Sequence, residues 1–253
     1  MPPSPWTFLD HPGPLAFAHQ GGGAEHPENT MVAFEHAVSL GYRYLETDVH
    51  ATADGVLVAF HDDDLDRMTD HGGSIEDLPW SVVRHARIQG GHPIPLLEDM
   101  RGAWPEVGIN IDPKHDAAVG PLAALLARTG AAGRVGVGSF SDRRLARLVR
   151  SVGPDLCTSL GPIGVARLVV ASRGVPVGRL RAACVQVPVT RRGITVTDAR
   201  LVEEAHQRGL QVHVWTVDDP VEMLRLLDLG VDGLMTGRPT LLKAVLEERG
   251  EWT

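Results

Sequence analysis

The sequence has 253 residues, a formal net charge of −8 at pH 7, 43% hydrophobic residues and 22% charged residues. This length and composition suit one large globular domain with an ample core. The acidic balance argues against nucleic-acid binding, which needs a basic surface. No segment approaches the ~20 apolar residues of a membrane span, so we expect no integral membrane segment.

The N-terminus and the cysteines bear on the compartment in which the protein works. Residues 1–14 are rich in proline and read as an irregular leader to a single domain at 15–249. They lack the apolar segment of a signal peptide, so we expect a cytoplasmic protein. The two cysteines, Cys157 and Cys184, are too few for a disulfide framework and lie in apolar segments, which predicts small buried side chains.

After the leader, apolar segments alternate with amphipathic segments, which predicts parallel strands alternating with helices. The strands are expected at 15–19, 43–49, 107–112, 134–138, 156–160, 183–187, 210–215 and 231–235. The helices that follow them are expected from about residue 27, with Asn29 or Thr30 as the cap, and at 97–104, 118–129, 142–152, 163–172, 198–208, 220–229 and 240–249.

Eight such units predict an α/β fold of the (β/α)₈ barrel type, a TIM barrel. An open doubly wound sheet is the less favoured alternative. It would place a glycine-rich phosphate loop before the first helix, where 21–23 are glycines. Their spacing is not that of the G-x-G-x-x-G motif, however.

The alternation is interrupted by a small insertion after the second strand, at approximately 50–95. Asp54 and Gly55 predict a tight turn into a short strand at 56–60. The remainder is polar, with one short helical piece near 77–87. We expect it to cover one mouth of the domain, because it looks too small and too polar to hold a core of its own.

Ionisable side chains gather at the ends of the predicted strands, where a packed core would not tolerate them unpaired. The active site of a (β/α)₈ barrel lies at the carboxyl ends of its strands, so these positions predict the functional site. The residues are His19, Glu46, Asp48, His61, Asp112 and Lys114, with the aromatic Trp215 at the end of the seventh strand.

Three of these residues form a candidate metal site. Glu46 and Asp48 lie two apart on one strand and therefore face the same side. Two buried carboxylates repel each other unless a cation or protons lie between them. With Asp112 at the end of the next strand, an all-oxygen site for Mg²⁺ or Ca²⁺ is favoured over salt-bridged or solvated carboxylates.

The segments AHQGG, PENT-x3-F, ETDV, TADG-x-LV and FHD follow one another between residues 18 and 62. In this order they resemble the glycerophosphodiester phosphodiesterase family. The resemblance implies the barrel fold, and metal-dependent hydrolysis of a small-molecule glycerophosphodiester to sn-glycerol 3-phosphate and an alcohol. It also implies that His19 and His61 are the catalytic acid and base, since imidazole exchanges protons near neutral pH.

The sequence departs from the family pattern at two places in the site. Gln20 stands where the family has an arginine for the phosphate, and a neutral amide donates hydrogen bonds without charge. The family usually has a glutamate two residues before a lysine at this point, whereas this sequence has Asp112 two residues before Lys114. We expect Gln20, Lys114 and Trp215 to contact the substrate.

Two other functions stay open at this point. One is a lysophospholipase D or sphingomyelinase-D-like phosphodiesterase that acts on acylated substrates. The other is a non-catalytic barrel that binds a phosphate ligand, which Gln20 suggests. The sequence leaves open the nucleophile (water or a glycerol hydroxyl through a cyclic phosphate), which histidine is the acid, the metal, the head group and the oligomeric state.

Overall fold

Eight parallel strands form the barrel that the sequence predicts. The computed structural model describes residues 6–253, and the strand order around the barrel is β8-β7-β6-β2-β1-β13-β12-β9. A parallel bridge between Ser159 and Cys184 joins β8 to β9 and completes the circle. The strands are β1 (Leu15–His19), β2 (Tyr44–Ala51), β6 (Gly108–Pro113), β7 (Val135–Val137), β8 (Cys157–Thr158), β9 (Cys184–Pro188), β12 (Gln211–Trp215) and β13 (Gly233–Thr236).

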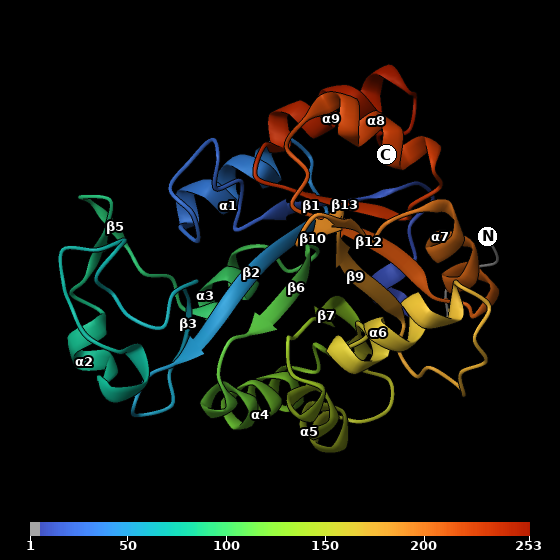
Figure 1. The fold of residues 1–253 in the computed structure, drawn as a ribbon. Coiled ribbons are helices and arrows are strands. Elements are labelled where there is room, and N and C mark those ends of the chain that lie inside the picture. Colours follow the sequence, from blue (N-terminus) through green and yellow to red (C-terminus); the bar gives the residue numbers. More distant parts are fainter. Residues whose placement is uncertain (1–5) are drawn as a thin grey trace.

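The helices that follow the strands lie on the outside of the barrel (Figure 1). They are α1 (Met31–Ser39), α3 (Leu97–Ala103), α4 (Val119–Thr129), α5 (Asp142–Val152), α6 (Pro162–Ala171), α7 (Ala199–Gln207), α8 (Pro220–Asp228) and α9 (Pro239–Glu248). Helix α1 begins at Met31, later than predicted, because Thr30 is its cap and accepts a hydrogen bond from the backbone of Ala33. Within residues 6–253, no helix combines the length and apolar character needed to cross a bilayer.

The amino-terminal end of the barrel is closed by the segment before β1. Residues 1–5 of the predicted leader lie outside the described part, and the rest of it contains η1 (Thr7–Leu9), a short 3₁₀ helix. Its Phe8 packs edge-on against Tyr44, with ring centroids 5.3 Å apart. Gly136 leaves room for this ring, since a Cβ at that position would lie 2.4 Å from Cε1 of Phe8. Cys157 and Cys184 are buried in the same cluster, as predicted.

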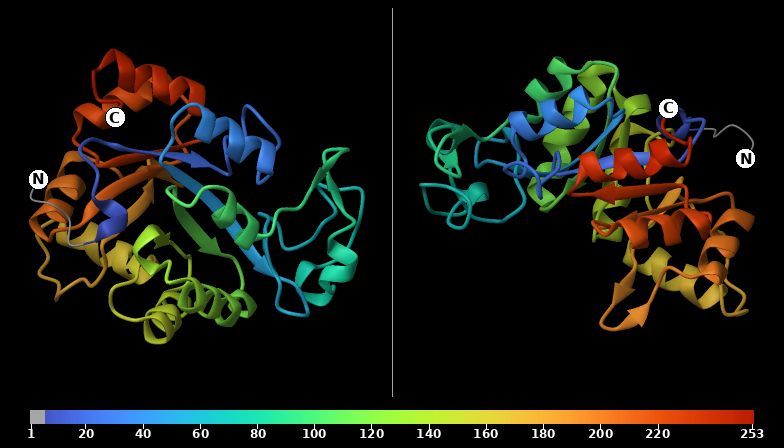
Figure 2. Two further views of the ribbon diagram at one scale, coloured as in Figure 1. Left: turned by 180° about the vertical axis from the view of Figure 1, so that it is seen from behind. Right: turned by 90° about the horizontal axis from the view of Figure 1, so that it is seen from above.

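The insertion projects from one side of the barrel, as the segment around α2 and β5 shows in Figures 1 and 2. It contains β3 (Leu57–Ala59), which pairs with β2, then η2 (Ile75–Asp77), α2 (Trp80–Val83), β4 (Arg87–Ile88) and β5 (His92–Pro93). The prediction that it has no core is wrong. Its apolar side chains are widely spaced in the sequence but pack together: Val58, Phe60, Leu65, Met68, Ile75, Val83, Ala86, Ile88 and Ile94.

A second hairpin, β10 (Thr190–Arg191) and β11 (Ile194–Thr195), was not predicted and lies between β9 and α7. Its turn is formed by Arg192 and Gly193, which both have positive φ values of 51° and 78°. A two-residue turn of this kind matches the twist of a hairpin.

His213 of β12 is a fully buried histidine inside the barrel. Its ring packs against Phe17, with centroids 5.1 Å apart. Burial lowers the pKa of His213 from 6.5 to about 4, because the charged ring would lose its hydration in this environment. The His213 ring is therefore neutral in the folded protein near pH 7.

Acid should destabilise the protein through His213. Between pH 6.5 and 4, His213 is protonated in the unfolded chain but stays neutral in the folded chain. The free energy of unfolding is therefore at its full value above about pH 6.5 and decreases as the pH falls toward 4. The gap between the two pKa values, 6.5 − 4 = 2.5, corresponds to about 3 kcal/mol. We expect His213→Leu to reduce the acid-induced loss of unfolding free energy by that amount in urea titrations. A pH profile that matches the wild type would contradict this expectation.

Candidate active site

The three predicted carboxylates lie toward the carboxyl ends of two neighbouring strands. Glu46 and Asp48 project from β2 and Asp112 projects from β6, and all three are buried. The register explains the convergence, because Asp48 lies directly opposite Asp112 and Glu46 lies opposite His19 of β1. Consecutive parallel strands thus bring these side chains together at one mouth of the barrel.

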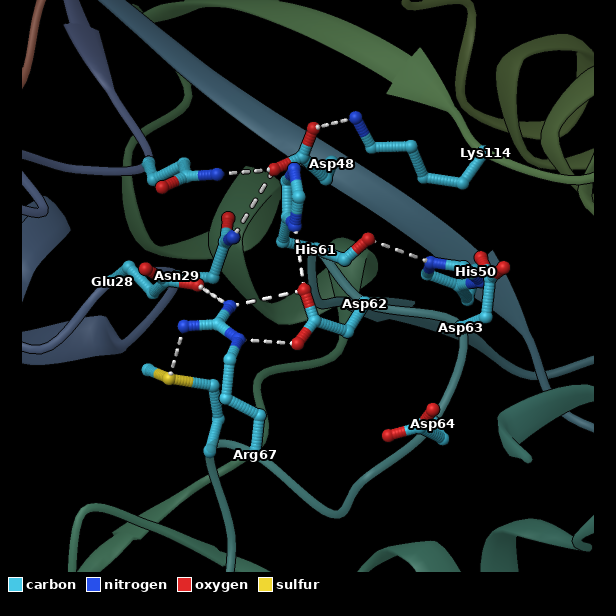
Figure 3. A network of polar contacts seen from close by, with 12 residues as sticks. Glu28, Asn29, Asp48, His50, His61, Asp62, Asp63, Asp64, Arg67 and Lys114 are labelled. Carbon is cyan, nitrogen blue, oxygen red and sulfur yellow. Dashed lines mark hydrogen bonds and ion pairs between the residues drawn. The ribbon is translucent and has the colours of Figure 1, made fainter. Parts of the chain in front are cut away.

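Lys114 lies between two of these acids. Its Nζ is 2.6 Å from Oδ1 of Asp48 and 3.0 Å from Oδ2 of Asp112. Burial alone would lower the pKa of Lys114, but the two carboxylates outweigh it and raise the pKa above its usual value. Lys114 is therefore a permanent cation in the carboxylate cluster, and Figure 3 shows its side chain extended toward Asp48.

The acids divide into one that is readily ionised and two that resist ionisation. Burial and the charge on Asp48 raise the pKa of Glu46 well above its usual value, and burial also raises the pKa of Asp112. Burial opposes ionisation of Asp48 too, but the Lys114 ammonium outweighs it and lowers the pKa of Asp48. A divalent cation at this cluster would take the place of the retained protons.

The donor atoms of the cluster are of the kind that a hard divalent cation prefers, although the Lys114 ammonium lies between Asp48 and Asp112 in this structure. All three candidate ligands offer carboxylate oxygens, which Mg²⁺ and Ca²⁺ prefer. Oδ1 of Asp112 is buried, and it is one of two such side-chain atoms in residues 6–253 that have no hydrogen-bond partner. An unpaired buried carboxylate oxygen is costly, so a ligand at this point is physically reasonable.

Two amide side chains hold the Asp48 carboxylate in place. Gln20 donates from its side-chain nitrogen to Oδ2 of Asp48 (2.7 Å), and its backbone N–H donates to Oε2 of Glu46 (3.1 Å). Asn29 donates to the same Asp48 oxygen at 3.4 Å and accepts from the hydroxyl of Thr47. The sequence offered Asn29 only as a helix cap; its positive φ of 53° turns it into the site instead.

The two predicted catalytic histidines flank the carboxylates. Nε2 of His19 lies 3.8 Å from Oε2 of Glu46. Burial lowers the pKa of His19, although the Asp48 charge partly opposes this effect, so the neutral ring is favoured. His61 lies on the other side and is half exposed, with its Nδ1 2.7 Å from Oδ1 of Asp62.

His61 contacts an ion-pair network that was not predicted from the sequence, although Asp62 of this network belongs to the FHD segment. Arg67 of the insertion donates to both oxygens of Asp62 and to Glu28, at 2.5, 3.0 and 2.8 Å. Figure 3 shows Arg67 between the two carboxylates and His61 above Asp62. The Arg67 hydrogen bonds lower the pKa of Asp62 to about 2, so Asp62 stays ionised and fixes the orientation of the His61 ring.

A cavity of about 710 Å³ opens beside this network. Its lining is mostly charged and includes one of the two catalytic candidates, His61, together with Asp62, Asp63, Asp64, Asp66, Arg67 and Lys114. A cavity of this size can admit a small molecule, and Arg67 and Lys114 are the cations among its four aspartates.

Trp215, the remaining predicted contact residue, lies at the end of β12 beside an aromatic residue from another loop. Its ring meets Phe140, which follows β7, edge-on with centroids 5.7 Å apart. Phe140 is 63% exposed, so its ring is open to solvent beside Trp215. The mouth therefore combines charged groups on β1, β2 and β6 with an aromatic pair at β7 and β12.

The fold and this cluster define a (β/α)₈-barrel enzyme whose site lies at the carboxyl ends of the strands. The model of the glycerophosphoryl diester phosphodiesterase family matches residues 19–241, and the chain belongs to that family of phosphoric diester hydrolases. It is 41% identical over 251 residues to the probable glycerophosphodiester phosphodiesterase 2 of Mycobacterium tuberculosis, covering 97% of this chain and 95% of the relative.

Two further relatives extend the comparison. The lysophospholipase D GDPD1 of Rattus norvegicus is 26% identical over 266 residues, covering 90% of this chain and 85% of that protein. The crystal structure of glycerophosphodiester phosphodiesterase from Agrobacterium tumefaciens superimposes with a TM-score of 0.75 at 26% identity, covering 90% of this chain and 98% of that one.

Proposed function

We propose that this protein hydrolyses glycerophosphodiesters to sn-glycerol 3-phosphate and an alcohol at the mouth of the barrel. The observation that carries the proposal is the placement of Glu46, Asp48 and Asp112 on β2 and β6, with Lys114 between Asp48 and Asp112. The family match and the flanking histidines support it.

Glu46, Asp48 and Asp112 would hold a divalent cation, Mg²⁺ or Ca²⁺. Such a cation, when bound, polarises a phosphoryl oxygen and neutralises charge that grows during the reaction. Lys114 adds a second positive charge from the protein, and Gln20 keeps Asp48 oriented. The substrate contacts of Gln20 and Lys114 are part of this proposal.

His19 and His61 would transfer the protons. One ring removes a proton from the nucleophile and the other donates a proton to the departing alkoxide. The Asp62 carboxylate holds Nδ1 of His61, which leaves Nε2 as the ring nitrogen that can exchange a proton with the substrate. Trp215 and Phe140 would form an apolar wall for the alcohol group.

A turnover screen would test the proposal. Glycerophosphocholine, glycerophosphoethanolamine and lysophosphatidylcholine should be supplied separately, with and without Mg²⁺ or Ca²⁺, and the released alcohol measured. We expect metal-dependent turnover that is fastest on the two deacylated diesters. Tight binding of these diesters without turnover in any condition would favour a non-catalytic binder and contradict the proposal.

The same screen tests a second candidate, a lysophospholipase D that acts on an acylated substrate. The exposed Phe140 beside Trp215 favours it, because an acyl chain needs apolar surface near the phosphate. The name of the relative from Rattus norvegicus points the same way. Faster release of choline from lysophosphatidylcholine than from glycerophosphocholine would select this candidate.

A further inference from the structure

A second cluster of metal-ligating side chains lies beside the proposed catalytic site and has no part in the proposed reaction. It contains His50 of β2, Asp63 of the insertion and His115, which follows Lys114 after β6. One ligand atom from each residue lies within 4.8 Å of the others. Figure 3 shows the Asp63 carboxylate beside the His50 ring.

The spacing of the ligand atoms is close to that of a metal site. Nε2 of His115 is 3.1 Å from Oδ1 of Asp63. Two ligands on a tetrahedral zinc ion, each ~2.05 Å from the metal, are ~3.3 Å apart. The His50 and His115 rings lie with their centroids 5.6 Å apart, which leaves room for an ion between ring nitrogens.

The other nitrogen of each ring is already held by an oxygen acceptor. Nδ1 of His115 lies 2.9 Å from a carboxylate oxygen of Glu76, and Nε2 of His50 lies 3.2 Å from the carbonyl oxygen of His61. Metal-binding histidines almost always donate their second N–H to a carboxylate or a backbone carbonyl, which fixes the tautomer. This pattern leaves Nε2 of His115 and Nδ1 of His50 available as ligands.

We propose that His50, Asp63 and His115 form a second metal site that binds Zn²⁺ or a similar transition metal. Two imidazoles and one carboxylate suit such an ion, whereas Mg²⁺ and Ca²⁺ prefer oxygen ligands. The site differs from the Glu46, Asp48 and Asp112 cluster in its residues and in its donor atoms.

The proposed ion would fasten the insertion to the barrel. Asp63 and Glu76 come from the insertion, whereas His50 lies in β2 and His115 follows β6, the two strands that carry Glu46, Asp48 and Asp112. His50 also holds the backbone of His61, so the ion would steady the segment that carries a proposed catalytic residue. The role assigned here is positioning, not chemistry on the substrate.

Zinc binding to the full-length protein tests this proposal directly. The purified chain is treated with a chelator, supplied with Zn²⁺ in the presence of excess Mg²⁺, and titrated against a chromophoric zinc chelator. We expect one strongly bound Zn²⁺. Asp63→Asn and His115→Gln should each weaken zinc binding by at least about tenfold. Both side chains are substantially exposed, at 70% and 33%, so these variants should fold.

His71→Gln is the matched control, because His71 pairs with Asp70 at 2.8 Å in the same insertion but lies outside the proposed site. Its zinc affinity should equal that of the wild type. The Co²⁺-loaded protein should show the visible absorption of a tetrahedral nitrogen–oxygen site, and Asp63→Asn should lose it. The proposal fails if no Zn²⁺ is retained, if the two variants bind like the wild type, or if Asp48→Asn is the variant that loses zinc.

Discussion

His61→Ala and His19→Ala should each lower kcat by ~10²–10⁴-fold, which is the usual contribution of a general acid or base. Both rings flank the buried carboxylates, and the Asp62 carboxylate orients the His61 ring. Neither alanine can move a proton at the reacting oxygen. The measurement is steady-state hydrolysis of glycerophosphocholine, with kcat and KM determined separately.

His85→Ala is the control for the loss of a histidine, because His85 is an exposed residue of the insertion. It should leave kcat within about twofold of the wild-type value, as a surface substitution usually does little. Circular dichroism of each variant would confirm that the fold is retained. A kcat for His61→Ala that matches His85→Ala would remove the acid–base role from His61.

Removal of divalent cations should abolish turnover, and Mg²⁺ or Ca²⁺ should restore it. The reason is the cluster of three buried acids, two of which resist ionisation without a cation. Asp48→Asn and Asp112→Asn should raise the cation concentration needed for half-maximal activity by at least about tenfold, because each removes a charged oxygen ligand.

Asp99→Asn is the matched control for this series, since Asp99 is an exposed acid on α3. Its cation dependence should equal that of the wild type. Full activity in excess chelator would rule out the metal role. An unchanged cation requirement in both ligand variants would instead place the cation elsewhere in the protein.

The barrel could be predicted because each strand and helix has a local signal. Apolar runs and helix caps such as Thr30 are visible in the sequence, and the order of strands and helices follows from them. The convergence of Asp48 with Asp112 could be anticipated too, because both end neighbouring parallel strands. The metal and substrate roles assigned to these residues stay predictions, as does the division of the chain into a leader and one domain.

Other parts depend on tertiary contacts that no local pattern reveals. The insertion holds a core because residues such as Leu65 and Ile88 meet only after the chain has turned back on itself. Arg67 reaches Asp62 and Glu28 for the same reason. His50 and His115 are far apart in the sequence and come together only because β2 and β6 are neighbours.

The barrel wall is weakly paired on both sides of β8 and strongly paired between β2 and β6. Six residue pairs hold β2 against β6, whereas β7 and β8 share two pairs and β8 meets β9 through one bridge. Fluctuations of the barrel wall should therefore concentrate around β8, between β7 and β9, away from the acids. Under the proposed function, such local motion would let the mouth admit alcohol groups of different sizes while the carboxylate cluster stays fixed.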